Sequence, residues 1–452
     1  MVQLYKIISN NNRGRKRKFD EISVKSLFSE NLAKNFIDCE VFLKTSKIKI
    51  LLPILKNVKT NQQSKTISHL ITVLYNKYYS DWLDLLKREY SAKDVIFYEA
   101  ETNKKLQAIK KHAYDKLACI FASETGNIHY TKDFLFDFSC LVASLFIHDD
   151  ERDNKQTMIS KSVESVQILN RWLLSIINHN KDEKNILSAI YKSFPEDLKE
   201  LPIPEQFSLL FGAALLWRGL KNMSDKSDFL FFFEQSLKAT VLETKQSKII
   251  DKNFKSFSNG KMKNELMTSD ELYFKLFREE TSFVKPCISM LLYGCLENKD
   301  KITLKNLIIG DKKQNGAIMV SLANQMICYA NSFGGIKKDL ETQWDFNNQI
   351  LRTYYQTFSS DYLNKSNSFI LKGVPLWMDQ IDDRHLNKCL EWESLKFRKL
   401  MYNFEIIKNS NDILKKISVN MISATLEYTF KHNDRYNKTS SKSVKRPRAA
   451  TL

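Results

Sequence analysis

Proline and glycine are scarce over long stretches of this chain. No proline lies between Ile54 and Phe194, and the 452 residues contain 11 glycines and 7 prolines in all. Both residue types destabilise a helix interior. The long segments without them carry apolar residues at helical spacing, as at Leu70, Val73 and Leu74. With 43% hydrophobic residues, the pattern predicts an all-α protein with a sizeable core, and strand-like alternation is too sparse to predict a sheet.

The predicted helices form one large domain between two polar ends. Residues 1–25 are predicted to be a disordered basic arm, 26–64 a helical extension, and 431–452 a basic disordered tail. Residues 65–430 form the main domain, with the polar stretch 244–266 predicted as an inserted loop. Helices are expected over about 66–95, 102–124, 131–149, 159–178, 183–193, 205–221, 229–243, 269–297, 302–310, 313–343, 345–363, 386–407 and 411–430.

The formal net charge of +18 is concentrated at the two ends of the chain. Residues 1–19 contain six Lys or Arg and no acid, and residues 431–452 contain seven Lys or Arg and one acid. About two thirds of the excess therefore lies in the ends, and no nucleic-acid partner is obligatory for the body. The remaining positive charge would help to attract an anionic substrate. The basic run 15–18 would also fit a nuclear address.

The cysteines and apolar runs indicate a cellular setting. The seven cysteines are scattered, without a CxxC pair or a nearby His at zinc spacing, so we expect buried free thiols in a reducing compartment. The chain starts without the apolar core of a signal peptide, and it has no run of about 20 apolar residues. We therefore expect a cytoplasmic protein without a membrane span, either a monomer or a homodimer.

An acidic run closes the apolar helix that is expected at 131–149. Asp149, Asp150 and Asp153 stand within it, and Asp149 and Asp153 share a helix face because they are four residues apart. Buried charge must be paired or bound to metal, and Mg²⁺ is held by a few carboxylates together with substrate phosphates. The run therefore predicts a magnesium site, with a solvated helix end as the alternative.

A second polar stripe lies in the helix that is expected at 313–343. Asn331, Gly335 and Asp339 are spaced by four residues and so share one face. The Asn331 oxygen and the Asp339 carboxylate can share a Mg²⁺, with a water in the space beside Gly335, and Lys338 can meet a phosphate. Two helical glycines cost about 1 kcal/mol each relative to alanine, and close helix packing is the alternative reason for them.

These two patterns resemble the metal motifs of class I terpene synthases, especially the single-domain microbial type. The run Asp149, Asp150 and Asp153 is similar to the family's DDxxD/E motif. The family's second motif, N-D-x-x-S/T/G-x-x-K-E/D, is matched at Asn331, Gly335, Lys338 and Asp339, with Ser332 in the place of the usual Asp. The resemblance covers residues 65–430.

Weaker matches keep the family's order along the chain. Arg278 stands upstream of the second motif, where the resemblance implies an arginine that senses the diphosphate. Ser282 then stands at the family's helix break, where a carbonyl assists ionisation. Downstream, Trp377 and the pair Arg384–His385 resemble the family's Trp and Arg-Tyr, with His385 replacing Tyr. Surface ion pairs are the alternative for Arg278 and Arg384.

The resemblance implies a helical-bundle enzyme that cyclises a prenyl diphosphate, with farnesyl diphosphate as the first expectation and geranyl or geranylgeranyl diphosphate as alternatives. Arg278, Lys338, Arg384 and His385 would bind the substrate, beside the candidate pocket residues Leu145 and Phe146. Three Mg²⁺ ions, or Mn²⁺, would be held by Asp149, Asp150, Asp153, Asn331, Gly335 through a water, and Asp339.

Three other functions stay open from the sequence. A trans-prenyltransferase of the same fold would carry a second DDxxD in place of the Asn331 stripe. A basic helical nucleic-acid-associated protein without catalysis would use the two ends and bind less tightly as salt rises. A degenerate synthase fold would bind isoprenoids without turnover. No DxDD motif of a class II cyclase is present.

Overall fold

The structure is a computed structural model of the 452-residue chain, and it is mostly helical, as predicted. The residues that it describes are 35–42, 47–54, 62–123, 128–153, 159, 162–178, 186–255, 278–310, 315–342, 348–354, 370–371, 374–375, 383–407 and 411–432.

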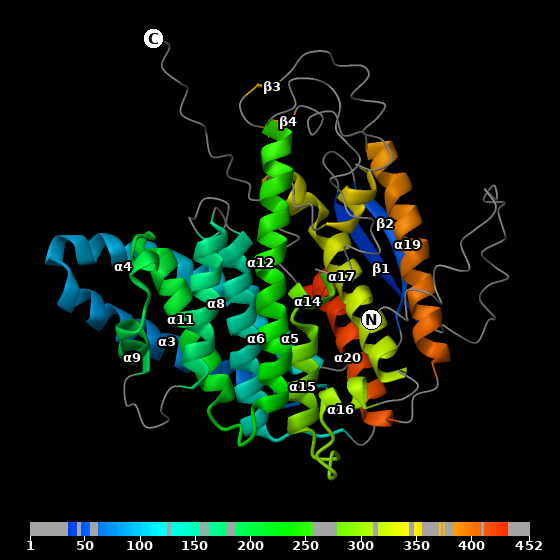
Figure 1. The fold of residues 1–452 in the computed structure, drawn as a ribbon, viewed down its shortest axis with the longest axis horizontal. Helices are drawn as coiled ribbons and strands as arrows, with labels where there is room; N and C mark the ends of the chain where they lie inside the picture. Colours follow the sequence, from blue (N-terminus) through cyan, green and yellow to red (C-terminus); the bar gives the residue numbers. More distant parts are fainter. Residues whose placement is uncertain are drawn as a thin grey trace.

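Long helices make up most of these ranges (Figure 1). In chain order the helices are α3 (Ser64–Glu89), α4 (Ala92–His112), α5 (Tyr114–Phe121), α6 (Lys132–Asp153), α8 (Val163–Ile177), α9 (Ile186–Lys192), α10 (Glu196–Lys199), α11 (Ile203–Leu220), α12 (Ser227–Lys255), α14 (Glu279–Thr281), α15 (Val284–Gly294), α16 (Leu304–Ile309), α17 (Asn315–Thr342), α19 (Asp383–Ile406), α20 (Asp412–Glu427) and a π-helix, η4 (Tyr428–His432). Two antiparallel hairpins pair β1 (Asn35–Phe42) with β2 (Lys47–Ile54) and β3 (Ile370–Leu371) with β4 (Val374–Pro375).

The core is built around the pair α6 and α11, which pack against each other more extensively than any other two elements. Nearly every residue of α11 is buried, as is typical of a helix that is apolar on all sides. Two glycines permit the close approach. A Cβ on Gly219 would lie 2.8 Å from the Asp137 carbonyl oxygen, and one on Gly212 would lie 2.8 Å from His148 Nε2. This crossing fixes the end of α6 that carries the acidic run.

Contacts link α6, α5, α20, α17 and α15 in a closed ring. Neighbouring members of the ring all touch, although they come from distant parts of the chain, and Figure 1 shows them side by side in the middle of the molecule. Apolar side chains of these helices belong to one continuous hydrophobic cluster. The ring therefore brings the end of α6 and the middle of α17 to a common interior.

The predicted helical extension over 26–64 is wrong for residues 35–42 and 47–54, which form β1 and β2. Exposed Glu40 and Lys49 face each other across the hairpin, an arrangement of opposite charges that favours pairing. The hairpin packs through β1 on α17 and through β2 on α19, so its inner face is buried by tertiary contact. The buried residues are Cys39 and Val41 of β1 and Ile50, Leu52, Pro53 and Ile54 of β2.

Two predicted helix boundaries also differ from the structure. The loop predicted over 244–266 is wrong for residues 244–255, which continue α12. This part contains four Lys and one Gln, which favour helices, and residues 256–266 lie outside the described residues. The single helix predicted over 66–95 is divided between α3 and α4, because the Ser91 hydroxyl accepts a hydrogen bond from Asp94 N and starts a new helix.

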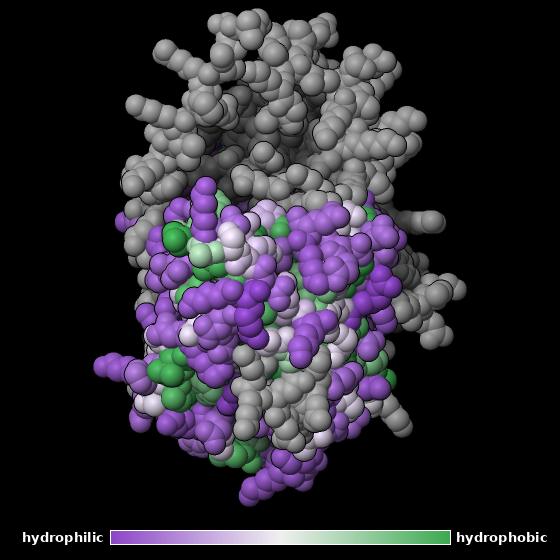
Figure 2. Space-filling model, turned by 90° about the vertical axis from the view of Figure 1, so that its left-hand side faces the viewer, coloured by the Kyte–Doolittle hydropathy of each residue, from purple (hydrophilic) through white to green (hydrophobic). Residues whose placement is uncertain are grey.

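The face formed by the helices at the left of Figure 1 is mostly hydrophilic, with small scattered apolar patches (Figure 2). No helix in the described part of the chain is long and apolar enough to cross a membrane.

Candidate functional site

A cavity lies within the ring of helices and holds about 790 Å³ of space not filled by protein, including space open to solvent. Its polar lining includes the predicted site residues Asp149, Arg278, Ser282 and Asn331. Apolar and aromatic side chains form the remaining wall, among them Leu117, Phe121, Val142, Leu145, Phe146, Phe283, Cys287, Ile327, Met421 and Tyr428. A cavity with mainly apolar walls and a few convergent polar groups is typical of a small-molecule site.

The acidic run at the end of α6 divides between different surroundings. Asp149 lines the cavity, whereas Asp150 Oδ2 accepts a hydrogen bond of 2.5 Å from Tyr114 Oη. Glu151 is 1% exposed and lies 2.5 Å from Lys105 Nζ of α4. Burial raises the pKa of Glu151, and the Lys105 charge opposes this shift. The side chain of Asp153 lies outside the described residues.

Stacked aromatic rings support the acidic end of the cavity. The Phe146 ring stacks on Tyr114 with centroids 5.0 Å apart and planes at 11°. Tyr114 in turn stacks on His112 at 5.4 Å, and Tyr428 Oη donates to the His112 carbonyl. The same stack therefore orders one wall of the cavity and, through the Tyr114 hydroxyl, the Asp150 carboxylate.

His148 precedes Asp149 and is 2% exposed. Burial, with a smaller contribution from Arg152, lowers the pKa of His148 to about 3. The imidazole is therefore neutral at physiological pH and fills the α6–α11 contact. The cavity thiol is neutral as well, because burial raises the pKa of Cys287 to about 12, and a thiol rather than a thiolate is a poor nucleophile.

Arg278 directly precedes α14, at the start of the broken helix α14–α15, and lines the cavity. Its guanidinium Nη1 is 4.0 Å from Glu243 Oε1, with side-chain exposures of 21% and 16%. The Arg278 carbonyl accepts a hydrogen bond from Cys328 Sγ at 3.7 Å. The partly buried guanidinium can thus present hydrogen-bond donors to an anion that enters the cavity.

The helix is interrupted where the resemblance to terpene synthases implies a break. α14 ends at Thr281, α15 begins at Val284, and Phe283 between them has a φ of 54° in the left-handed region. A bulky residue rarely adopts this conformation. Pro286 follows in the first turn of α15, and since proline has no N–H it cannot donate a helical hydrogen bond to the Ser282 carbonyl.

The residues of the polar stripe of α17 also lie in different surroundings. Asn331 lines the cavity, whereas Asp339 Oδ2 accepts a hydrogen bond of 2.7 Å from Asn348 Nδ2. A Cβ on Gly335 would lie 3.0 Å from the same Oδ2 atom, so the glycine leaves room for the Asp339 carboxylate. Ser332 Oγ accepts from Gln349 N at 3.2 Å and so anchors the segment that follows α17.

Two predicted residues at the start of α19 do not reach the cavity lining. Arg384 is exposed and His385 half-buried, both in the first turn of α19, and neither lines the cavity. Trp377 and the Lys338 side chain lie outside the described residues.

Other lining residues were not predicted, although their spacing offered a signal. Leu117 and Phe121 of α5 are four apart, as are Met421 and Thr425 of α20, and Tyr428 follows in η4. Such spacing places residues on one helix face. It does not reveal that the face borders a cavity rather than plain core.

The donor chemistry of the site suits a hard cation. Among the side chains that the structure describes, no group of three or more His, Cys, Asp or Glu residues gathers around a possible metal position. Asp149 and Asn331, however, both line one cavity, and their side chains carry carboxylate and amide oxygens. Oxygen ligands of this kind, completed by water and substrate phosphate, are those that Mg²⁺ prefers.

In comparisons with known proteins, no family model matches the chain, and no curated protein matches it at a significant level.

Proposed function

We propose that this protein is a Mg²⁺-dependent class I terpene cyclase of the helical-bundle type. It would ionise a prenyl diphosphate, with farnesyl diphosphate as the first candidate, and cyclise the carbocation to a terpene hydrocarbon or alcohol. The observation that carries the proposal is the meeting of Asp149, Arg278, Ser282 and Asn331 on the wall of one largely apolar cavity. The resemblance to class I terpene synthases assigns all four residues to the ionisation of a prenyl diphosphate.

The charged end of the cavity suits a diphosphate. Asp149 and Asn331 would hold Mg²⁺, with Asp150, Asp153 and Asp339 as further candidate ligands. When bound, the metal would neutralise charge on the leaving group. Arg278 would donate hydrogen bonds to diphosphate oxygens, and charge-assisted bonds of this kind strengthen as negative charge develops on the leaving group.

The break between α14 and α15 suits the ionisation step. Because Pro286 cannot donate to it, the Ser282 carbonyl is excluded from the helical hydrogen-bond ladder of α15. Its partial negative charge would favour positive charge on the substrate carbon as the C–O bond breaks. Arg278 and Ser282 would thus act on opposite charges of the same transition state.

The apolar part of the cavity suits a reactive cation. The rings of Phe146, Phe283 and Tyr428 line it, and aromatic faces attract positive charge. The neutral Cys287 thiol adds no strong nucleophile to the wall. Apolar walls would also exclude water until a proton is lost or a single water is admitted.

Product analysis tests the proposal. Purified full-length protein would be incubated with Mg²⁺ and, separately, with geranyl, farnesyl and geranylgeranyl diphosphate, and the volatile products analysed by mass spectrometry. We expect a cyclic terpene from at least one substrate. Folded protein that makes no product from any of them would contradict the proposal. Longer linear prenyl diphosphates formed after adding isopentenyl diphosphate would indicate a trans-prenyltransferase instead.

A further inference from the structure

The break between α14 and α15 disturbs the backbone hydrogen bonds around it. In a continuous helix, the Glu279 carbonyl would accept from the N–H of Phe283, four residues later. With Phe283 in the left-handed region, that N–H instead meets the Glu280 carbonyl at 3.5 Å. The Glu279 carbonyl has therefore lost its helical donor, and a buried carbonyl needs a replacement.

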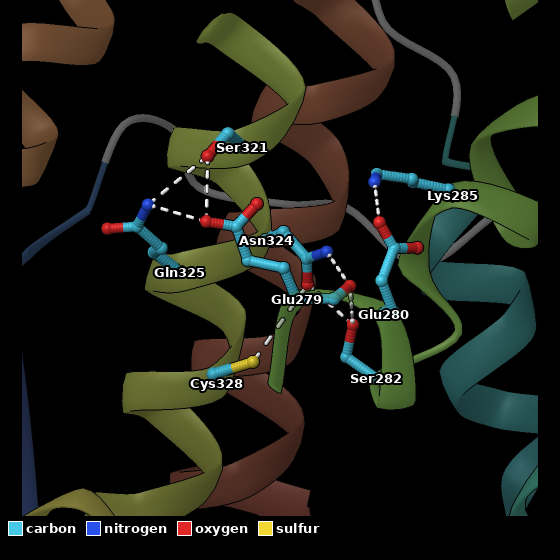
Figure 3. A network of polar contacts seen from close by, with 8 residues as sticks. All are labelled: Glu279, Glu280, Ser282, Lys285, Ser321, Asn324, Gln325 and Cys328. Atoms are coloured by element: carbon cyan, nitrogen blue, oxygen red, sulfur yellow. Dashed lines mark hydrogen bonds and ion pairs between the residues drawn. The ribbon is translucent and has the colours of Figure 1, made fainter. Parts of the chain in front are cut away.

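One side chain from another helix supplies that replacement. Asn324 of α17 is 0% exposed, and its Nδ2 donates to the Glu279 carbonyl. Its Oδ1 accepts from Ser282 Oγ at 2.5 Å, and Ser282 Oγ also lies 3.1 Å from the Glu279 carbonyl. Figure 3 shows Asn324 directed at this segment. Both ends of one amide therefore bind the first residue of α14, Glu279, and the residue that follows this helix, Ser282.

Asn324 also connects the break to the other polar group of the cavity. It lies seven residues before Asn331 on α17, which is about two helical turns, so the two side chains share a face. Asn331 lines the cavity, as do Arg278 and Ser282 on either side of α14. A single rigid helix thus carries a candidate metal ligand and the residue that fixes the break.

Docking of α14 on α17 has a separate anchor. Glu279 Oε1 accepts hydrogen bonds of 2.8 Å from both Ser321 Oγ and Gln325 Nε2 (Figure 3). These bonds involve the side chain of Glu279 and not the backbone of the break. Removal of the Asn324 amide would therefore change the geometry of the break while the carboxylate still holds α14 on α17.

We infer that Asn324 is a positioning residue, which holds the α14–α15 break in the shape that presents Arg278 and Ser282 to the cavity. The inference rests on the proposed function, because the effect of the break is exerted on the diphosphate substrate. Asn324 itself lines no part of the cavity wall. Its role is to fix the backbone conformation of the segment that carries Arg278 and Ser282.

The test compares Asn324→Leu, which keeps the side-chain volume but no hydrogen bond, with Ser321→Ala, which removes a bond to Glu279 and leaves the break intact. We expect kcat of Asn324→Leu to fall about 10- to 100-fold, since small misplacements of reacting groups carry penalties of this size. The KM for the prenyl diphosphate should change by less than about threefold. Ser321→Ala should keep kcat within about twofold of wild type, although it too loses a hydrogen bond.

Asn324→Asp provides a conservative variant in case the leucine variant does not fold. It keeps the acceptor for Ser282 Oγ and loses the donor to the Glu279 carbonyl, so we expect an intermediate kcat. Equal kcat in Asn324→Asp, Asn324→Leu and an active wild type would overturn this inference and leave the proposed function standing. So would equal losses of kcat in Ser321→Ala and Asn324→Leu. A wild type without turnover would overturn the proposed function, and this inference with it.

Discussion

Replacing Phe283 with glycine should leave a more stable protein than replacing it with alanine. Phe283 is 5% exposed and has a φ of 54°, and its ring lies 5.9 Å from that of Phe233. Both substitutions remove the same buried ring, at a cost of about 3–5 kcal/mol. They differ in the backbone, because glycine adopts the left-handed region without a steric penalty.

The size of the difference follows from two opposing effects. The left-handed conformation costs a residue with a Cβ about 1–2 kcal/mol, whereas glycine loses about 0.5–1 kcal/mol more backbone entropy on folding than alanine. We therefore expect the free energy of unfolding of Phe283→Gly to exceed that of Phe283→Ala by about 0.5–1 kcal/mol. In an ordinary helical conformation the order is reversed.

Urea unfolding followed by circular dichroism measures the difference, and the neighbouring residue provides a matched control. Ser282 has a φ of −73°, so Ser282→Ala should be more stable than Ser282→Gly by about 0.5–1 kcal/mol. If Phe283→Ala is as stable as Phe283→Gly or more stable, while the Ser282 pair follows the ordinary order, the left-handed break is refuted.

Two further predictions concern buried charges beside the site. Burial raises the pKa of Glu279 above its ordinary value of 4.5, against the opposing effect of hydrogen bonds from Ser321 and Gln325. The folded protein therefore binds this proton more tightly than the unfolded chain, and wild type should gain stability relative to Glu279→Gln as the pH falls through the raised pKa towards 4.5. Urea unfolding across that pH range measures the difference in unfolding free energy between wild type and Glu279→Gln. A difference that does not change with pH would contradict the prediction. Lys105→Met would leave Glu151 without this partner at 1% exposure and should cost about 3 kcal/mol, most of which Lys105→Met/Glu151→Gln should recover. Equal unfolding free energies for the single and double variants would rule out this account of the pair.

Short sequence motifs were enough to predict four of the residues that line the cavity. Asp149, Arg278, Ser282 and Asn331 each stand in a short pattern on or beside a predicted helix, and helical spacing decides which face they occupy. The way in which the acidic run divides could not be predicted, because it depends on partners far away in the chain. Asp150 is bound by Tyr114, and Glu151 is bound by Lys105 of α4.

The unpredicted features depend on tertiary contact. The hairpin of β1 and β2 has only two strands, and its inner face is buried only because α17 and α19 lie against it. Asn324 is one of several polar residues of α17, and its role follows from the break that it contacts across the helix interface. Neither contact has a periodicity that can be read along the chain.

In the proposed function, Asp149 and Asn331 serve one diphosphate-releasing site. Pyrophosphate release from the prenyl diphosphate that wild type converts can be measured in Mg²⁺ for wild type, Asp149→Asn, Asn331→Leu and the control Asp81→Asn, whose carboxylate pairs with Lys77 and does not line the cavity. We expect wild type and Asp81→Asn to release pyrophosphate at similar rates, and the two cavity variants to lose about 100-fold or more of this rate, with unchanged helicity. Wild-type rates in both cavity variants would contradict it.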